Sequence, residues 1–228
     1  MTRADIPPRV PARDYSRPER IADAAIHAAG LVLALAAGPA LVVAAALLDG
    51  RGAVVASVAV YVAALLGMLA ASAAYNLLHR SARREVLRRL DHAAIYVKIA
   101  ATQTPFAVLV GAGPALWALG SVWTAAILGA LAKLAMPARL GRVSLPLYLA
   151  LGWAGMAIVF SGDAETGLST AALALIVVGG LLYTLGTLFF VAERMPYHNA
   201  VWHGFVLAAS AVFFAAVAVE LGVRVNSA

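Results

Sequence analysis

The sequence contains no cysteine, and only 12% of its 228 residues are charged. The absence of cysteine excludes disulfides and thiolate metal ligands, so a bound transition metal would need His, Asp, Glu or water. An ordinary soluble domain carries about 25% charged residues, so this composition excludes that class of protein. Strand-like alternation between turn signals is also missing, which argues against a lipid-facing barrel and leaves a bundle of helices.

Long apolar runs make up most of the chain, which is 63% hydrophobic. A helix of about 20 residues crosses a hydrocarbon core of about 30 Å. The sequence therefore predicts an all-α fold: a disordered cytoplasmic tail in 1–20, a seven-transmembrane helix bundle in 21–222 and a short outer tail in 223–228. The predicted spans are 21–48, 54–78, 93–110, 115–136, 144–160, 170–191 and 200–219.

Positive charges gather on alternate connections between these spans. Of the 17 Lys and Arg, only Arg51 and Arg224 lie on the side opposite the N-terminal tail, and Lys98 lies inside a span. The positive-inside rule therefore predicts a cytoplasmic N-terminus and, after seven crossings, an outer C-terminus. This topology and attraction to anionic lipid explain the net charge of +6, so membrane lipids are the expected partners and nucleic acid is not.

All five histidines fall on the predicted cytoplasmic side, among other polar residues. On the second helix Ser72, Asn76 and His79 follow at i, i+4 and i+7 and share a face. On the seventh, Asn199 and His203 have the i, i+4 spacing at which two side chains can reach one ion.

Asp91 lies at the start of the third predicted helix, on the same side of the membrane. An aspartate, a serine and histidines from three helices describe a hydrolytic metal site, in which the metal activates a water and the carboxylate orients it or accepts its proton. The alternative is that polar residues collect at helix ends because the ends reach the wet interface.

Several motifs, in order along the chain, resemble those of the hemolysin III family, bacterial relatives of the progestin and adipoQ receptors and, more distantly, of the alkaline ceramidases. The resemblance implies seven helices in the bacterial cytoplasmic (inner) membrane and a zinc ion near the cytoplasmic face. It implies one zinc ligand four residues after the second-helix serine and two in an H-x-x-x-H on the seventh helix. The motifs are "ERIADAAIHAAG", "LRRLDHAAIY", "TPF", "LPLYLALGW", "GGLLYTLGTLFF" and "MPYHNAVWHGFV".

Carried onto this sequence, the resemblance gives Ser72 and Asp91 as catalytic residues and His203 as a zinc ligand. The other two ligand positions hold Asn76 and Asn199. Zinc accepts a neutral amide oxygen poorly beside imidazole, so the resemblance predicts a degenerate zinc site in which two of the three histidines are replaced.

Two alternatives follow for this site. In the first, His79 and His198 turn inward and restore zinc ligation. In the second, the site works without zinc, and Lys98 neutralises Asp91 directly or through water, since it lies on the same face of the helix about 10 Å further on. Snorkelling of Lys98 to an interface is the competing interpretation.

The first predicted helix carries Glu19, Asp23 and His27 at i, i+4 and i+8. We expect these residues to face the bundle, with His27 in the pocket but separate from the zinc ligands. Hydrogen bonding between helices is the expected role, and catalysis is the alternative.

Three functions remain open. Loss of the ligands favours a protein that binds lipid or acts in membrane lipid homeostasis. Resemblance to the ceramidases implies instead a zinc-dependent hydrolase of lipid amides or esters, with Asp91 as general base and Ser72 orienting the water or stabilising the oxyanion. The family's name suggests a pore-forming cytolysin. Each of these rests on analogy at the level of the fold.

Overall fold

The protein is a bundle of helices, and the described part of the chain contains no strand. The computed structural model describes residues 15–78, 81–111, 113–136, 143–162 and 167–227. Six helices are long and apolar enough to cross a membrane, and α5 with α6 forms a seventh, shorter apolar segment, as predicted. The helices are α1 Arg17–Leu48, α2 Gly52–Leu77, α3 Arg84–Val110, α4 Gly113–Ala135, α5 Ser144–Ala154, α6 Met156–Val159, α7 Thr170–Val191 and α8 His198–Ser227.

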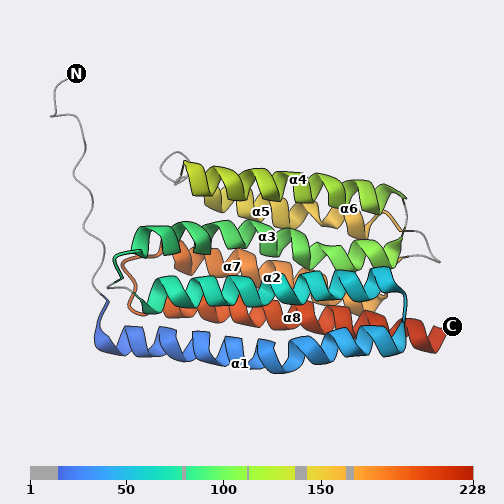
Figure 1. The fold of residues 1–228 in the computed structure, drawn as a ribbon, viewed down its shortest axis with the longest axis horizontal. Coiled ribbons are helices and arrows are strands. Elements are labelled where there is room, and N and C mark those ends of the chain that lie inside the picture. Colours follow the sequence, from blue (N-terminus) through green and yellow to red (C-terminus); the bar gives the residue numbers. More distant parts are fainter. Residues whose placement is uncertain (1–14, 79–80, 112, 137–142, 163–166, 228) are drawn as a thin grey trace, which may run out of the picture.

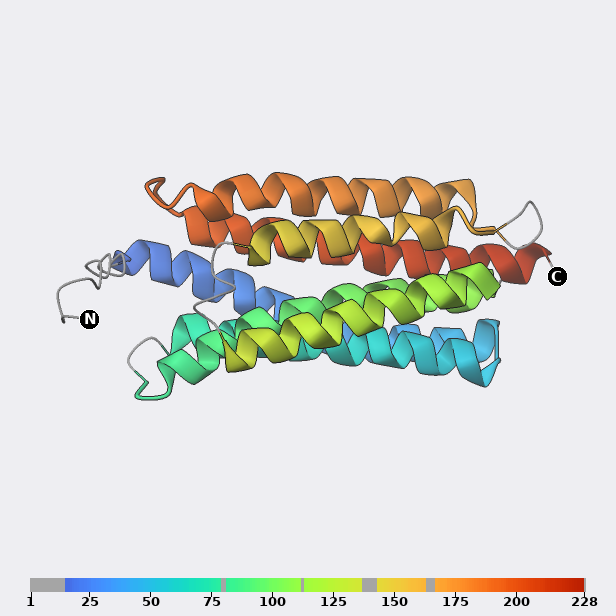
Figure 2. The same ribbon diagram turned by 90° about the horizontal axis from the view of Figure 1, so that it is seen from above.

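The helices run side by side along one common axis (Figures 1 and 2). Helix α2 packs against both α1 and α3, α4 packs against α3, and α7 packs against α8, which returns to contact α1. The start of α1 and the end of α8 lie at opposite ends of the bundle (Figure 1), as an odd number of crossings requires. Which end faces the cytoplasm stays a prediction.

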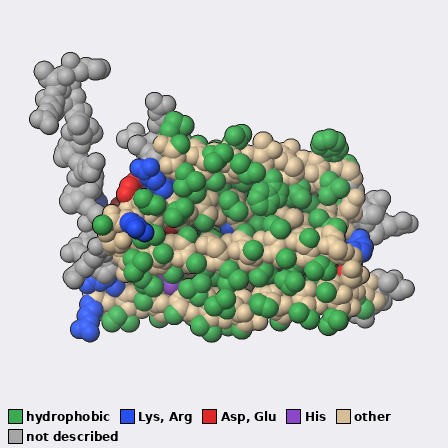
Figure 3. All heavy atoms as spheres, in the orientation of Figure 1, with side chains coloured by type: hydrophobic (Ala, Val, Ile, Leu, Met, Phe, Trp, Pro, Cys, Tyr) green, Lys and Arg blue, Asp and Glu red, His purple; other side chains and the backbone are tan. Residues whose placement is uncertain are grey.

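Apolar side chains cover the outside of the bundle between its two ends. Figure 3 shows them spread over one face, with most of the visible Lys and Arg at the end where α1 begins. Trp117 is 81% exposed, Leu47 80% and Phe160 76%. An exposed apolar surface of this extent is stable in lipid rather than in water, so the structure is that of an integral membrane protein.

Both ends of the helical domain extend beyond the predicted limits. Helix α1 begins at Arg17 because the Ser16 hydroxyl accepts from the Glu19 N–H while the Glu19 carboxylate accepts from the Ser16 N–H, a capping box. Helix α8 continues to Ser227. Residues 17–20, which were expected to be disordered, are therefore helical, and α8 continues through 223–227 of the predicted outer tail. Residues 1–14 lie outside the described part.

Helix α3 also begins earlier than predicted, at Arg84 instead of Ala93. Its first turns carry Glu85, which pairs with Arg88 at 3.0 Å and with Arg89 at 3.2 Å. Such i, i+3 and i, i+4 pairs stabilise a helix that hydropathy alone does not detect. Asp91 consequently lies inside the helix and not at its start.

Helix α5 stops at Gly155, where the side chain of Gln103 approaches the backbone. A Cβ added at Gly155 would lie 2.7 Å from the Gln103 side-chain carbon Cδ. Gln103 Nε2 donates to the backbone carbonyl of Leu151 at 3.0 Å. The glycine therefore allows α3 and the α5–α6 segment to pack closely at this point.

Candidate functional site

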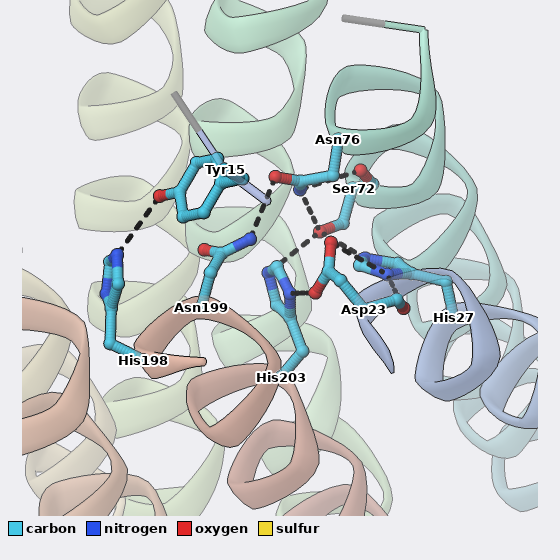
Figure 4. A network of polar contacts seen from close by, with 8 residues as sticks. All are labelled: Tyr15, Asp23, His27, Ser72, Asn76, His198, Asn199 and His203. Atoms are coloured by element: carbon cyan, nitrogen blue, oxygen red, sulfur yellow. Dashed lines mark hydrogen bonds and ion pairs between the residues drawn. The ribbon is translucent and has the colours of Figure 1, made fainter. Parts of the chain in front are cut away.

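Four side chains from three helices form a buried polar cluster (Figure 4). Asp23 and His27 lie one turn apart on α1, Ser72 lies on α2, and His203 lies on α8. The His203 Nδ1–H donates to Asp23 Oδ1 at 2.6 Å, and the His27 Nδ1–H donates to the Asp23 backbone carbonyl at 2.8 Å. Asp23 thus fixes the orientation of both imidazole rings.

Both histidines point their second ring nitrogen at the same hydroxyl. Ser72 Oγ lies 3.1 Å from His27 Nε2 and 3.5 Å from His203 Nε2. A neutral imidazole whose Nδ1 carries the proton presents an acceptor at Nε2, whereas a hydroxyl has one proton to donate. One acceptor therefore remains available to a cation.

This cluster includes a set of groups that fits a metal ion. Asp23, His27 and His203 each offer a ligand atom, and these atoms lie within 4.8 Å of one another. A metal-binding imidazole usually donates its other N–H to a carboxylate or a backbone carbonyl, and both rings do so here. That His27 is separate from the zinc ligands stays a prediction, and the alternative is that it joins His203 in holding a metal ion.

The two asparagines at the implied ligand positions contact each other. Asn199 Nδ2 donates to Asn76 Oδ1 at 3.2 Å, and Asn76 Nδ2 donates to the Ser72 backbone carbonyl at 2.9 Å. The Asn76 amide oxygen is therefore already used as an acceptor, and both amide groups are neutral. The set formed by Asn76, Asn199 and His203 therefore does not fit zinc.

Asp91 faces the same cluster from α3. Its carboxylate is buried and lies within interaction range of Ser72, His203 and Asp23. The structure thus brings the two predicted catalytic residues, Ser72 and Asp91, together with His203. Their catalytic roles stay predictions.

The two histidines expected to repair the zinc site give no second set of ligands in the described part of the chain. His198 is buried, its Nε2 lies 3.0 Å from the Tyr15 hydroxyl, and the two rings stack with centroids 5.7 Å apart. His79 lies outside the described residues. Ligation by either histidine stays a prediction.

Lys98 lies further along α3 and contacts an aromatic side chain of α7. Its ammonium donates to the Tyr183 hydroxyl, which in turn lies 2.8 Å from Ser210 Oγ. The lysine is 4% exposed. Among the residues that the structure describes, Lys98 forms no ion pair with Asp91, so direct neutralisation is wrong, and its burial argues against snorkelling to an interface. Neutralisation of Asp91 through water stays a prediction.

A cavity of about 1190 Å³ joins the polar cluster to Lys98. Ser72, Asn76, Asp91, Asn199 and His203 line one part of it, and His198 also reaches its wall. Apolar side chains line much of the cavity, among them Met68, Ile95, Ile99, Phe106, Ile176 and Phe213.

Asp23 belongs to this cluster but is not among the predicted site residues. The signal was available, because Asp23 and His27 are i, i+4 neighbours on one face of the first helix. Their contact with His203 joins residues 180 positions apart. It depends on how α1 and α8 are rotated about their axes, which the helical period alone does not fix.

The chain is similar in sequence to known hemolysin proteins. Residues 16–214 match the family described as Haemolysin-III related. The chain is 34% identical over 201 residues to the hemolysin-3 homolog of Bacillus subtilis (strain 168), covering 86% of this chain and 91% of that protein. Hemolysin-3 of Bacillus cereus is 33% identical over 197 residues, covering 86% of this chain and 89% of that protein.

A more distant similarity extends to animals. The human monocyte to macrophage differentiation factor is 33% identical over 129 residues, which cover 56% of this chain and 52% of that protein. No solved structure matches the chain.

Proposed function

Because this chain belongs to the hemolysin III family of membrane proteins, we propose that it binds a lipid between its helices and acts in membrane lipid homeostasis. The cavity of about 1190 Å³ is the observation that carries this proposal. Ligand cavities commonly measure about 300–1000 Å³ and combine apolar walls with a few placed polar groups.

The polar and apolar side chains that line the cavity match the head group and the acyl chain of a lipid. Ser72, Asn76 and Asn199 supply hydroxyl and amide groups at one part, while apolar side chains such as Ile95 and Phe106 line the remainder. Burial of an acyl chain against such walls contributes about 0.8 kcal/mol for each CH₂ removed from water. Binding needs this space and no metal, so it tolerates the two asparagines.

Lipid that co-purifies with the protein tests the proposal. We expect mass spectrometry of extracts from detergent-purified protein to show a bound lipid. Substitution Gly152→Phe should remove most of it, because Gly152 lines the cavity and a Cβ there meets nothing within 4 Å. Gly120 is equally open but does not line the cavity, so Gly120→Phe is the matched control. Equal lipid in both variants would contradict the proposal.

A second candidate function is hydrolysis of lipid amides or esters. The convergence of Asp23, His27 and His203 within 4.8 Å favours it. His27 and His203 would hold the metal through Nε2, with Asp23 accepting from the His203 Nδ1–H, and zinc when bound would supply a Lewis acid to polarise a carbonyl. Asp91 lies where it could accept a proton, and the Ser72 hydroxyl could orient a water or stabilise the oxyanion.

Fatty acid released from ceramide vesicles tests this second candidate. If the chain is a hydrolase, Asp91→Asn should lower the rate by roughly 10²–10⁴-fold, since removal of a general base has an effect of that size. Asp49→Asn is the control because Asp49 lies outside the cavity and pairs with Arg51. Lipid that co-purifies without any release by the wild type would leave binding as the function.

A further inference from the structure

Lys98 places an amine in the middle of a membrane-spanning helix. It lies near the midpoint of α3, is 4% exposed and lines the cavity. No carboxylate in the described part of the chain forms an ion pair with it. A lysine at the centre of a bilayer costs about 2.5–3.5 kcal/mol on insertion scales, and such residues usually have a partner and a function.

The contacts that Lys98 does make are with neutral groups. Its ammonium donates to the Tyr183 hydroxyl and lies 4.3 Å from the centroid of the Tyr183 ring and 5.7 Å from that of Phe213. The ring faces attract a cation, and the hydroxyl satisfies one of the three N–H donors. These groups stabilise the positive charge without neutralising it, so the site favours an anion from outside the chain.

Asp91 is the nearest acidic residue along α3, but it belongs to the other part of the cavity. Seven residues separate it from Lys98, or about 10 Å along the helix axis. Its carboxylate interacts with Ser72 and His203 instead. Lys98 is therefore a cationic group of the cavity that lies apart from Asp91. The other Lys and Arg that line the cavity are Arg84, Arg88, Arg89 and Lys133.

We propose that Lys98 binds the carboxylate of a long-chain fatty acid inside the cavity. One lysine balances the single charge of a carboxylate, whereas a phosphate monoester carries close to two charges. Apolar side chains of the same cavity, including Ile99, Phe106 and Ile176, match an acyl chain. This inference rests on the proposed lipid-binding function and adds the chemical class of the head group.

The experiment compares two probes that differ only in the head group. Binding of oleate and of oleyl alcohol is measured on the purified full-length protein in uncharged detergent micelles. We expect the wild type to bind oleate about tenfold or more tightly than oleyl alcohol, because a charged hydrogen bond away from water has an effect of this size. Lys98→Met should abolish the preference while leaving oleyl alcohol binding intact.

Two further variants control for charge and for folding. Lys98→Arg should keep a preference for oleate. Arg51→Met should also keep it, because Arg51 is a cation outside the cavity that pairs with Asp49 at 2.8 Å. The comparison of oleate with oleyl alcohol on the wild-type protein does not depend on whether any variant folds.

The outcomes separate this inference from the proposed function. Equal affinity of the wild type for oleate and oleyl alcohol, or a preference for oleate that survives in Lys98→Met, would overturn the fatty-acid site while lipid binding stands. Failure of both probes to bind, together with an absence of co-purifying lipid, would overturn both proposals.

Discussion

Replacing Asn76 and Asn199 together by histidine is expected to raise the affinity of the protein for zinc by roughly a thousandfold or more. The two side chains already meet, since Asn199 Nδ2 lies 3.2 Å from Asn76 Oδ1. The double variant would add two imidazoles to His203. Structural zinc sites with four ligands bind with about 10–16 kcal/mol, so two added ligands contribute several kcal/mol.

Zinc affinity is measured by competition with a chelator of known affinity, alongside elemental analysis of the purified protein. The double substitution to glutamine is the matched control, because it keeps the neutral amides and adds no imidazole. A double-histidine variant that binds zinc no better than the glutamine variant would show that the two positions do not converge on one ion. The wild type itself reports whether Asp23, His27 and His203 bind zinc.

The largest effect on stability is expected at Glu220, which ties the start of α7 to α8. Its side chain is buried at 1% exposure. The carboxylate accepts from the Ser169 N–H at 2.9 Å and pairs with Arg224 at 2.8 Å. Ser169 in turn caps α7 by accepting from the Ala172 N–H. Glu220→Leu leaves the Ser169 N–H and the Arg224 side chain without this carboxylate, and we expect a loss of about 3 kcal/mol.

The free energy of unfolding is measured by denaturant titration in micelles. Glu85→Leu is the control, because Glu85 also forms ion pairs but its side chain is 52% exposed. An exposed pair contributes about 1 kcal/mol or less, so the control should lose little. Equal losses of unfolding free energy in Glu220→Leu and Glu85→Leu would mean that burial does not strengthen the interactions of Glu220.

The number of apolar segments could be predicted from the sequence because hydropathy runs are local. Helix limits depend on features that hydropathy ignores. The ion pairs of Glu85 with Arg88 and Arg89 stabilise additional helical turns at the N-terminal end of α3. The Ser16–Glu19 capping box begins α1 within the predicted tail. Both signals are visible in the sequence, but each is weaker than an apolar run.

Part of the candidate site could likewise be predicted from the sequence, and part could not. The shared face of Ser72 and Asn76 follows from the helical period alone, and the structure confirms that both line one cavity. The contact of His203 with Asp23 and that of Lys98 with Tyr183 join distant parts of the chain. They depend on the rotation of packed helices, which spacing within one helix does not determine.

The short segment formed by α5 and α6 has a consequence for the surrounding bilayer. With 11 residues in α5, four in α6 and Gly155 between them, the segment rises by roughly 24 Å, less than a hydrocarbon core of about 30 Å. The neighbouring long helices span the full thickness, so the hydrophobic mismatch is confined to one side of the protein. The bilayer on this side must become thinner to match the length of the segment, at a cost of a fraction of a kcal/mol per Å of mismatch. This side therefore favours membranes with shorter acyl chains.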